Sequence, residues 1–222
     1  MGNQNEIFSL DVETIDINSV ISTPISGAPL TNSEIQIKNI EHHFRQIMLA
    51  LKLDLDDDSL INTPLRVAKM YVNEAFSGLN PANEPEMTLF ENKYSYGEII
   101  LEKDIPVYSY CEHHFVPIIG KAHIAYISEG KIVGLSKLNR AVRYFSKRPQ
   151  VQERLTLEIA DFLKQKLDTE HVAVVIEAEH LCISSRGIKD TGSTTITGSY
   201  HGCFETDRKM ELLQLINKPD FS

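Results

Sequence analysis

The chain has little of what would mark a secreted, membrane-spanning or nucleic-acid-binding protein. Its 222 residues include three cysteines, a small and odd number that does not build a disulfide framework. No apolar segment resembles a signal peptide or approaches the length of a membrane-spanning helix. Basic residues number 22 against 31 acidic ones, and the net charge of -9 argues against a general nucleic-acid binder. We therefore expect a cytoplasmic protein with reduced thiols and with neither a membrane nor a nucleic-acid partner.

What the chain does contain is the composition of a globular protein. Hydrophobic residues make up 42% and charged residues 24%, enough for a real core. The segment 1–33 is polar and lacks sustained periodicity, so we expect a flexible N-terminal arm there. Helical patterns follow and strands come later, so we divide the rest into an N-terminal helical part, 34–92, and a second domain, 93–222, which holds the candidate catalytic residues described below.

Hydrophobic spacing and capping residues predict the individual elements. A helix starts after a capping box formed by Thr31 and Glu34, and a second runs from Thr63, its expected N-cap, to about Gly78. Short β-branched runs predict strands at 99–101, 107–110, 122–127, 172–178 and 193–197. Further helical patterns cover 138–145, 155–167 and 207–216. Helices followed by a sheet with two intervening helices make an α+β fold.

Two cysteines and a histidine form the strongest chemical signal. Cys111 and His114 stand in the run CEHH at 111–114, and Cys182 ends the run HLC at 180–182, in a predicted strand. Two thiols and an imidazole suit zinc better than magnesium or calcium. Because only three ligands present themselves, a fourth position is left for water, as in a hydrolytic zinc site. The neighbouring His113 and His180 can move protons near neutral pH.

Two other interpretations of these residues stay open at this point. A Cys-x-x-His pair is a weak signal by itself, because buried free cysteines are common in protein cores. Cys203, beside His201, could also complete a structural site with four ligands. Since Gly198, Ser199 and Gly202 indicate a turn around it, we treat Cys203 as an ordinary thiol.

A second signal is cationic. Lys137, Arg140 and Arg143 follow one another at three-residue intervals along a predicted helix, with Ser136 as its expected N-cap. A helix N-terminus favours anions, and added basic side chains make a site for phosphate or carboxylate. Arg186, four residues past the second cysteine, could bring another guanidinium to the metal. The alternative is a merely solvated basic face, but these charges stand between metal ligands in an acidic chain, which favours anion binding.

Five runs of this sequence together resemble the signatures of zinc-dependent GTP cyclohydrolase I. They are TPLRVAKM at 63–70, CEHHF at 111–115, GLSKLNR at 134–140, RPQVQERLT at 148–156 and HLC at 180–182. The similarity extends from about residue 34 to 208, which leaves the N-terminal arm outside it. The resemblance implies a tunnelling fold, with a four-stranded antiparallel sheet, two helices on one face and a preceding helical part. It also implies a homodecamer with active sites between subunits.

The resemblance further implies an activity and a set of roles. GTP would be hydrolysed at C8 of its imidazole ring, releasing formate and giving 7,8-dihydroneopterin triphosphate, the first step of pterin and tetrahydrofolate biosynthesis. Zinc would sit on Cys111, His114 and Cys182. By the same resemblance, His113 and His180 would transfer protons, and Ser136 would help with the ribose rearrangement. Glu153, with Gln152 beside it, would recognise guanine. The triphosphate would be bound by Ser136, Lys137, Arg140 and Arg186, with Arg66 and Lys69 from a neighbouring subunit.

Two rival functions come from other classes. A nitrile reductase on the same fold would use a cysteine nucleophile with NADPH, without a paired zinc-ligand histidine and second cysteine. A non-catalytic, zinc-stabilised interaction protein would be expected to lose His113, His180 or Glu153, and all three are present. The sequence therefore favours the hydrolase.

Overall fold

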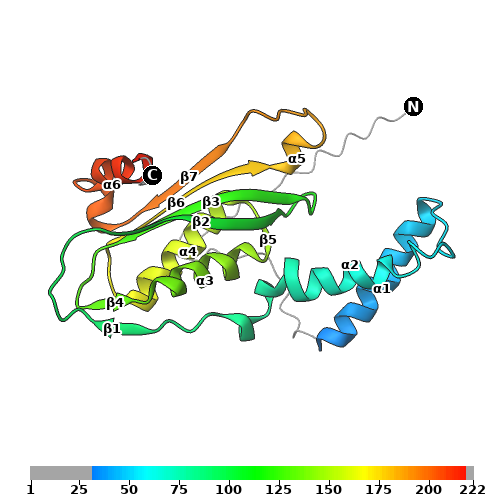
Figure 1. Cartoon of the computed structure of the whole chain (residues 1–222), viewed down its shortest axis with the longest axis horizontal. Coiled ribbons are helices and arrows are strands. Elements are labelled where there is room, and N and C mark those ends of the chain that lie inside the picture. Colours follow the sequence, from blue (N-terminus) through cyan, green and yellow to red (C-terminus); the bar gives the residue numbers. More distant parts are fainter. Residues whose placement is uncertain (1–31, 219–222) are drawn as a thin grey trace, which may run out of the picture.

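The computed structural model describes residues 32–218, and the fold in this range is α+β, as predicted. One five-stranded sheet forms its centre, helices cover one face of that sheet, and a helical part extends from one end (Figure 1). The arm predicted for 1–33 lies, except for its last two residues, outside the described residues.

The sheet consists of four antiparallel strands and one short parallel strand. In spatial order they are β5 (Pro149–Gln150), β2 (Ile100–Cys111), β3 (Pro117–Tyr126), β6 (Val172–His180) and β7 (Thr195–Tyr200). Except for Ile99, the runs predicted as two strands at 99–101 and 107–110 belong to the single strand β2, whose pattern is interrupted by a register shift between Glu102 and Ile105. A separate antiparallel pair joins β1 (Leu89–Glu91) to β4 (Lys131–Val133).

Two helices pack on the same face of the sheet. They are α3 (Leu135–Ser146) and α4 (Gln152–Leu167), and Figure 1 shows both beneath the strands. Their apolar stripes, with Leu138 and Ile159 among the fully buried residues, meet the strand residues Val107, Ile124 and Ile176 in the main core. Burial of such side chains is the dominant stabilising term of the fold.

Within residues 32–218, the opposite face of the sheet is covered at one end only. There η4 (Gly202–Glu205) and α6 (Lys209–Asn217) bury Phe204 and Leu212 against the sheet. Further along, this face exposes three large apolar side chains: Tyr108 (58% exposed), its register partner Ile119 (41%) and Ile196 (66%). An apolar strip of this kind on an open sheet is typical of a surface that another chain covers.

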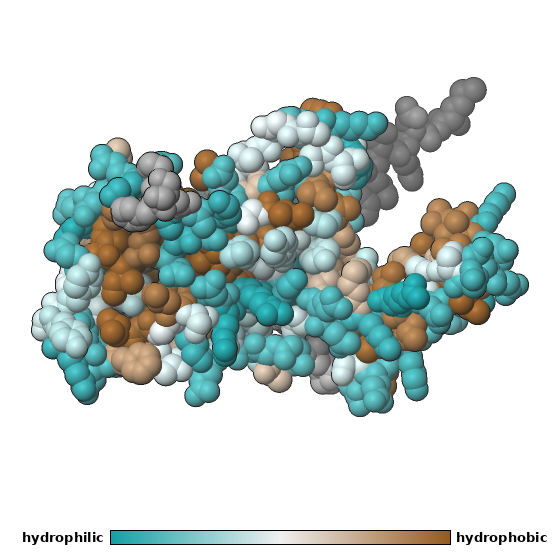
Figure 2. All heavy atoms as spheres, viewed as in Figure 1, coloured by the Kyte–Doolittle hydropathy of each residue, from teal (hydrophilic) through white to brown (hydrophobic). Residues whose placement is uncertain are grey.

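The helical part stands apart from this core. It comprises α1 (Ser33–Ala50), α2 (Thr63–Met70), one π-helical turn η1 (Tyr71–Ala75) and the 3-10 turns η2 (Ser77–Leu79) and η3 (Pro81–Asn83). Of α1 only Met48 is buried, while Ile47, Leu49 and Leu51 are about half exposed or more. Figure 2 shows apolar side chains gathered on the surface of this part. No helix within 32–218 combines the length and apolar character needed to cross a membrane.

Two predicted helix starts differ by a residue from those observed. The cap of α1 is Asn32, whose side chain accepts a hydrogen bond from the Glu34 N–H at 2.8 Å, while Thr31 lies outside the described residues. Thr63 is the first helical residue of α2, after Asn62. The helix ends at Met70 and continues to Gly78 only through the π and 3-10 turns, so the single helix predicted for 63–78 is wrong.

Candidate functional site

Three predicted metal ligands meet where strands β2 and β6 end. Both strands flank β3, with Tyr110 opposite Pro117 on one side and His180 opposite Ile118 on the other. Cys111 is the last residue of β2, and Cys182 lies in the short helix α5 (Leu181–Ser184), not in a strand as predicted. The ligand atoms of Cys111, His114 and Cys182 lie within 4.8 Å of one another.

The turn after β2 folds the histidine back towards the cysteine. The Phe115 N–H donates to the Cys111 carbonyl at 2.8 Å, and the Cys111 N–H donates to the Val116 carbonyl at 2.9 Å. Phe115 has a φ of 54°, a left-handed conformation that is unusual for a bulky residue and reverses the chain within a few residues. As a result the Nδ1 atoms of His113 and His114 lie 3.7 and 3.9 Å from the Cys111 Sγ.

The donor set fits a zinc ion. Burial raises the pKa of the Cys182 thiol, and the adjacent Cys111 thiol raises it further, so a bound cation is what would hold Cys182 as a thiolate. Among the described residues, no other group of three or more such side chains comes as close together, and Cys203 lies outside this one. The three-ligand set predicted from the sequence is therefore brought together by the fold.

Arg186 already lies beside one of the ligands. Its NH1 donates to the His114 Nε2 at 2.9 Å. A neutral imidazole that gives one nitrogen to a metal carries its proton on the other, so it has no lone pair left for a guanidinium. Metal binding by His114 would therefore release Arg186, which is exposed at the edge of the cluster and suited to an anion.

Gln152 holds His180 in one orientation. Its buried Nε2 carries two hydrogens and faces three acceptors, the Ile176 carbonyl at 3.0 Å, the Thr195 carbonyl at 2.9 Å and the Thr197 hydroxyl at 3.1 Å. Oε1 is therefore the atom that faces the histidine. The distance from Gln152 Oε1 to His180 Nε2 is 2.7 Å, so Nε2 must donate and Nδ1 stays unprotonated. Burial lowers the pKa of His180, against an opposing effect of the Glu153 charge, and this favours a neutral base.

The first turn of α4 carries further site residues. Glu153 is exposed and makes no hydrogen bond or ion pair with another described residue, so its carboxylate is available to a ligand. The next residue, Arg154, donates to the carboxylate of Glu112, which the sequence did not single out although it stands inside the CEHH run. The other oxygen of Glu112 lies 3.8 Å from the Nε2 of His113, whose side chain is 64% exposed.

The cationic helix lies towards the other end of the sheet in the same chain. Its N-cap is Gly134, so the predicted cap Ser136 is the second helical residue, and no side chain caps the helix. The Asn139 side chain contacts Glu102, near the start of β2. Cys111 stands nine positions after Glu102 along the strand, a distance on the order of 25 to 30 Å. One chain therefore does not bring Ser136 and Lys137 to its own metal ligands.

The remaining predicted phosphate contacts are also separate from the cluster. Arg140 and Arg143 line a hollow of about 350 Å³ together with Lys147. Burial lowers the pKa of Lys147, and the charge of Arg143 lowers it further. Arg66 and Lys69 are exposed on α2, and no hydrogen bond or ion pair joins them to another described residue. All four are open to a ligand or to a second chain.

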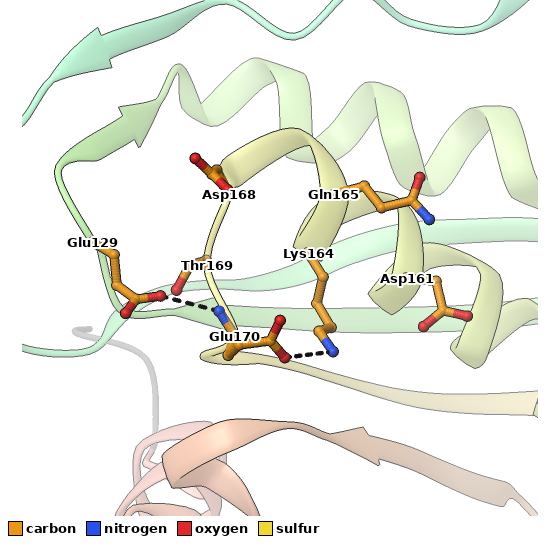
Figure 3. Close-up of a pocket in the computed structure, with 7 residues that line it drawn as sticks. All are labelled: Glu129, Asp161, Lys164, Gln165, Asp168, Thr169 and Glu170. Atoms are coloured by element: carbon orange, nitrogen blue, oxygen red, sulfur yellow. Dashed lines mark hydrogen bonds and ion pairs between the residues drawn. The ribbon is translucent and has the colours of Figure 1, made fainter.

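A hollow of about 400 Å³ lies at the opposite end of α4 from Gln152, and Figure 3 shows the residues that line it. Lys164 pairs there with Glu170 at 2.8 Å, and the Glu170 N–H donates to Glu129. Its lining is mainly acidic and includes none of the predicted site residues: Glu129, Asp161, Lys164, Gln165, Asp168, Thr169 and Glu170. An acidic hollow repels a triphosphate, so it does not suit the substrate that the resemblance implies.

Comparison with known proteins shows the family of the chain. The family model of GTP cyclohydrolase I matches residues 40–217. A GTP cyclohydrolase 1 of Flavobacterium johnsoniae is 49% identical over 215 residues, which cover 96% of each chain. One of Vibrio parahaemolyticus is 50% identical over 187 residues, covering 84% of this chain and 86% of its own. The chain therefore belongs to the GTP cyclohydrolase I family.

Proposed function

We propose how the residues of this enzyme carry out the hydrolysis of GTP, which is the activity of the GTP cyclohydrolase I family to which the chain belongs. Water opens the imidazole ring at C8, formate leaves, and rearrangement yields 7,8-dihydroneopterin triphosphate. The observation that carries the proposal is the convergence of Cys111, His114 and Cys182 within 4.8 Å. When bound there, zinc supplies Lewis acidity that lowers the pKa of a water molecule towards neutrality.

The histidines on either side of the ligands handle the protons. His180 is held by Gln152 with Nδ1 free, so it can accept a proton or return one at the purine N7 and in the opened ring. His113 is exposed and reaches the same space from the turn after β2. Ser136 is assigned to the rearrangement of the ribose that precedes closure of the new ring.

Glu153 selects the base. An exposed carboxylate without a protein partner accepts two hydrogen bonds, and guanine offers N1–H and the 2-amino group as donors side by side. Gln152 keeps its proposed position beside the base, and in the structure its Oε1 accepts a hydrogen bond from His180. Arg186 binds the triphosphate beside the metal ligands, and Ser136, Lys137 and Arg140 bind it from a second copy of the chain, with Arg66 and Lys69 of a neighbouring subunit.

A complete site takes residues from more than one chain. The metal ligands and the N-terminus of α3 lie apart in one chain, so a second copy must supply the cationic half. Among the described strands β7 ends the sheet on one side, and β5 covers only the last residues of β2 on the other. Open edges and an uncovered apolar face suit closure of several sheets into a ring, the tunnelling fold, and we propose a homodecamer.

The test replaces one thiol at a time. The parent protein incubated with GTP should release formate and, after oxidation, give a fluorescent pterin. Cys182→Ser should lose zinc and formate release yet stay folded, because a hydroxyl is a poor zinc ligand of similar size. Cys203→Ser, at the thiol outside the cluster, should keep both.

Zinc content, thermal unfolding and assembly size should be measured together on the same samples. A structural zinc contributes directly to folding, so an unfolded or monomeric Cys182→Ser would count against a catalytic zinc. Full activity in a zinc-free variant would exclude it.

A further inference from the structure

Helix α4 begins beside the metal ligands and carries one side chain, Arg154, to which no role has yet been assigned. Gln152 supports His180 and Glu153 is assigned to guanine, while Arg154 turns to the other side of the site. We propose that Arg154 is a positioning residue that, through Glu112, holds the turn of the metal ligands in its reactive geometry. This inference rests on the proposed metal site and extends it to a pair outside the ligands.

The guanidinium of Arg154 is held from three sides. Its NH2 donates to the Oε2 of Glu112 and to the Pro149 carbonyl, the latter at 3.1 Å, and its Nε donates to the Gln150 Oε1 at 3.0 Å. The side chain is 12% exposed. A guanidinium presents its donors in a rigid planar fork, so three acceptors leave it one position and thereby place the Glu112 carboxylate.

Glu112 joins this anchor to both functional residues beside it. It stands between the ligand Cys111 and the proton-transfer residue His113, and its Oε1 faces the His113 Nε2 at 3.8 Å. Its own N–H donates to the Gln150 carbonyl at 3.0 Å. Main chain and side chain of Glu112 are therefore both tied to the segment that leads into α4.

The turn needs such support from outside. Its base is closed by hydrogen bonds of Cys111 to Phe115 and Val116, but its tip holds Phe115 in a left-handed conformation and exposes His113 and His114. Side chains that orient metal ligands without touching the metal typically change metal affinity or activity ten- to a hundredfold when removed. The Arg154–Glu112 pair has the position of such a support.

The alternative is an ion pair that stabilises the fold and does nothing for the site. Cobalt(II) distinguishes the two, because its visible absorption in a thiolate site reports ligand geometry without any substrate. We would compare the cobalt-substituted parent with Arg154→Met, Glu112→Gln and the double variant. Lys164→Met is the matched control, since it removes the Lys164–Glu170 pair at the other end of the same helix.

Arg154→Met and Glu112→Gln should each weaken cobalt binding by about 10- to 100-fold and alter the visible bands. With zinc, kcat for GTP should fall while KM changes little, because neither side chain is placed against the substrate. The double variant should be no worse than the poorer single variant, since both remove one linkage. Lys164→Met should behave as the parent.

Cobalt affinity and spectra equal to those of the parent in both single variants would overturn the proposal, as would losses that add up in the double variant. If Arg154→Met does not fold, Glu112→Gln decides, because that side chain is 26% exposed and its loss leaves the core intact. A parent protein that binds cobalt without thiolate absorption would refute the proposed metal site itself, a result separate from any behaviour of the variants.

Discussion

Replacing Gln152 with methionine would remove a buried amide and keep the volume of the side chain nearly constant. In the structure the amide satisfies the carbonyls of Ile176 and Thr195 and accepts the hydrogen bond of His180. The Thr197 hydroxyl keeps a second partner, Thr156, at 2.6 Å. Three groups therefore lose a partner in the variant.

The expected magnitude follows from these three groups. An unsatisfied buried polar group costs about 1–3 kcal/mol, and water can reach the outer strand β7, so we expect a loss of about 3 kcal/mol of unfolding free energy. His180 would no longer be limited to the tautomer with a free Nδ1. Since general acid–base catalysis contributes about 100- to 10,000-fold, we expect kcat to fall by at least about 100-fold.

Steady-state kinetics and denaturant unfolding test the two parts separately. Thr197→Val is the control, because it removes one acceptor of the Gln152 amide and leaves the contact with His180 in place. Its kcat should stay near that of the parent. A Gln152→Met protein with unchanged kcat and a raised KM would refute the support of His180 and assign Gln152 to the base instead.

Two further predictions concern base selection and acid stability. Glu153→Ala should lose GTP turnover while keeping its zinc, and the parent should not turn over ATP, because a base without guanine's donors leaves the carboxylate unpaired at about 1–3 kcal/mol or more; comparable rates on ATP and GTP would contradict this. His123 is buried, burial lowers its pKa, and its Nδ1 accepts a hydrogen bond from the Asp104 N–H at 3.2 Å. Below about pH 6.5 this imidazole is protonated in the unfolded chain but still neutral in the folded one. The free energy of unfolding should therefore fall with falling pH, by up to about 1.4 kcal/mol per pH unit from this group. His123→Asn should flatten that slope in denaturant unfolding, and an unchanged slope would show that other groups cause it.

The long periodic segments could be predicted from the sequence because their spacing is set by burial on one face. The helices α3 and α4 and the strand β6 lie where those patterns indicated, while β3 begins at Pro117, ahead of the run predicted for 122–127. Helix starts were misplaced, by one residue at Asn62 and by two at Gly134, because a cap depends on backbone angles as well as on residue type. The two-residue strand β5 has no pattern of its own, since its pairing depends on the end of β2.

The site likewise has a part that could be predicted from the sequence and a part that could not. The metal ligands could be predicted because thiol and imidazole chemistry is specific to residue type. The contact of Gln152 with His180 and that of Arg154 with Glu112 could not, because the partners are 28 and 42 residues apart and meet only through the fold. The distance between the cationic helix and the metal ligands likewise depends on the path of β2, which no local pattern records.

The most direct test of the account is whether two defective chains can complete each other's sites. Cys182→Ser lacks the metal half of the site and Lys137→Ala lacks part of the cationic half, so each alone should be inactive. Co-expressed in equal amounts with different tags and purified as mixed oligomers, they should regain about one quarter of the parent's formate release, because one interface in four combines two intact halves. Mixed oligomers that release no more formate than either variant alone would contradict a site shared between chains.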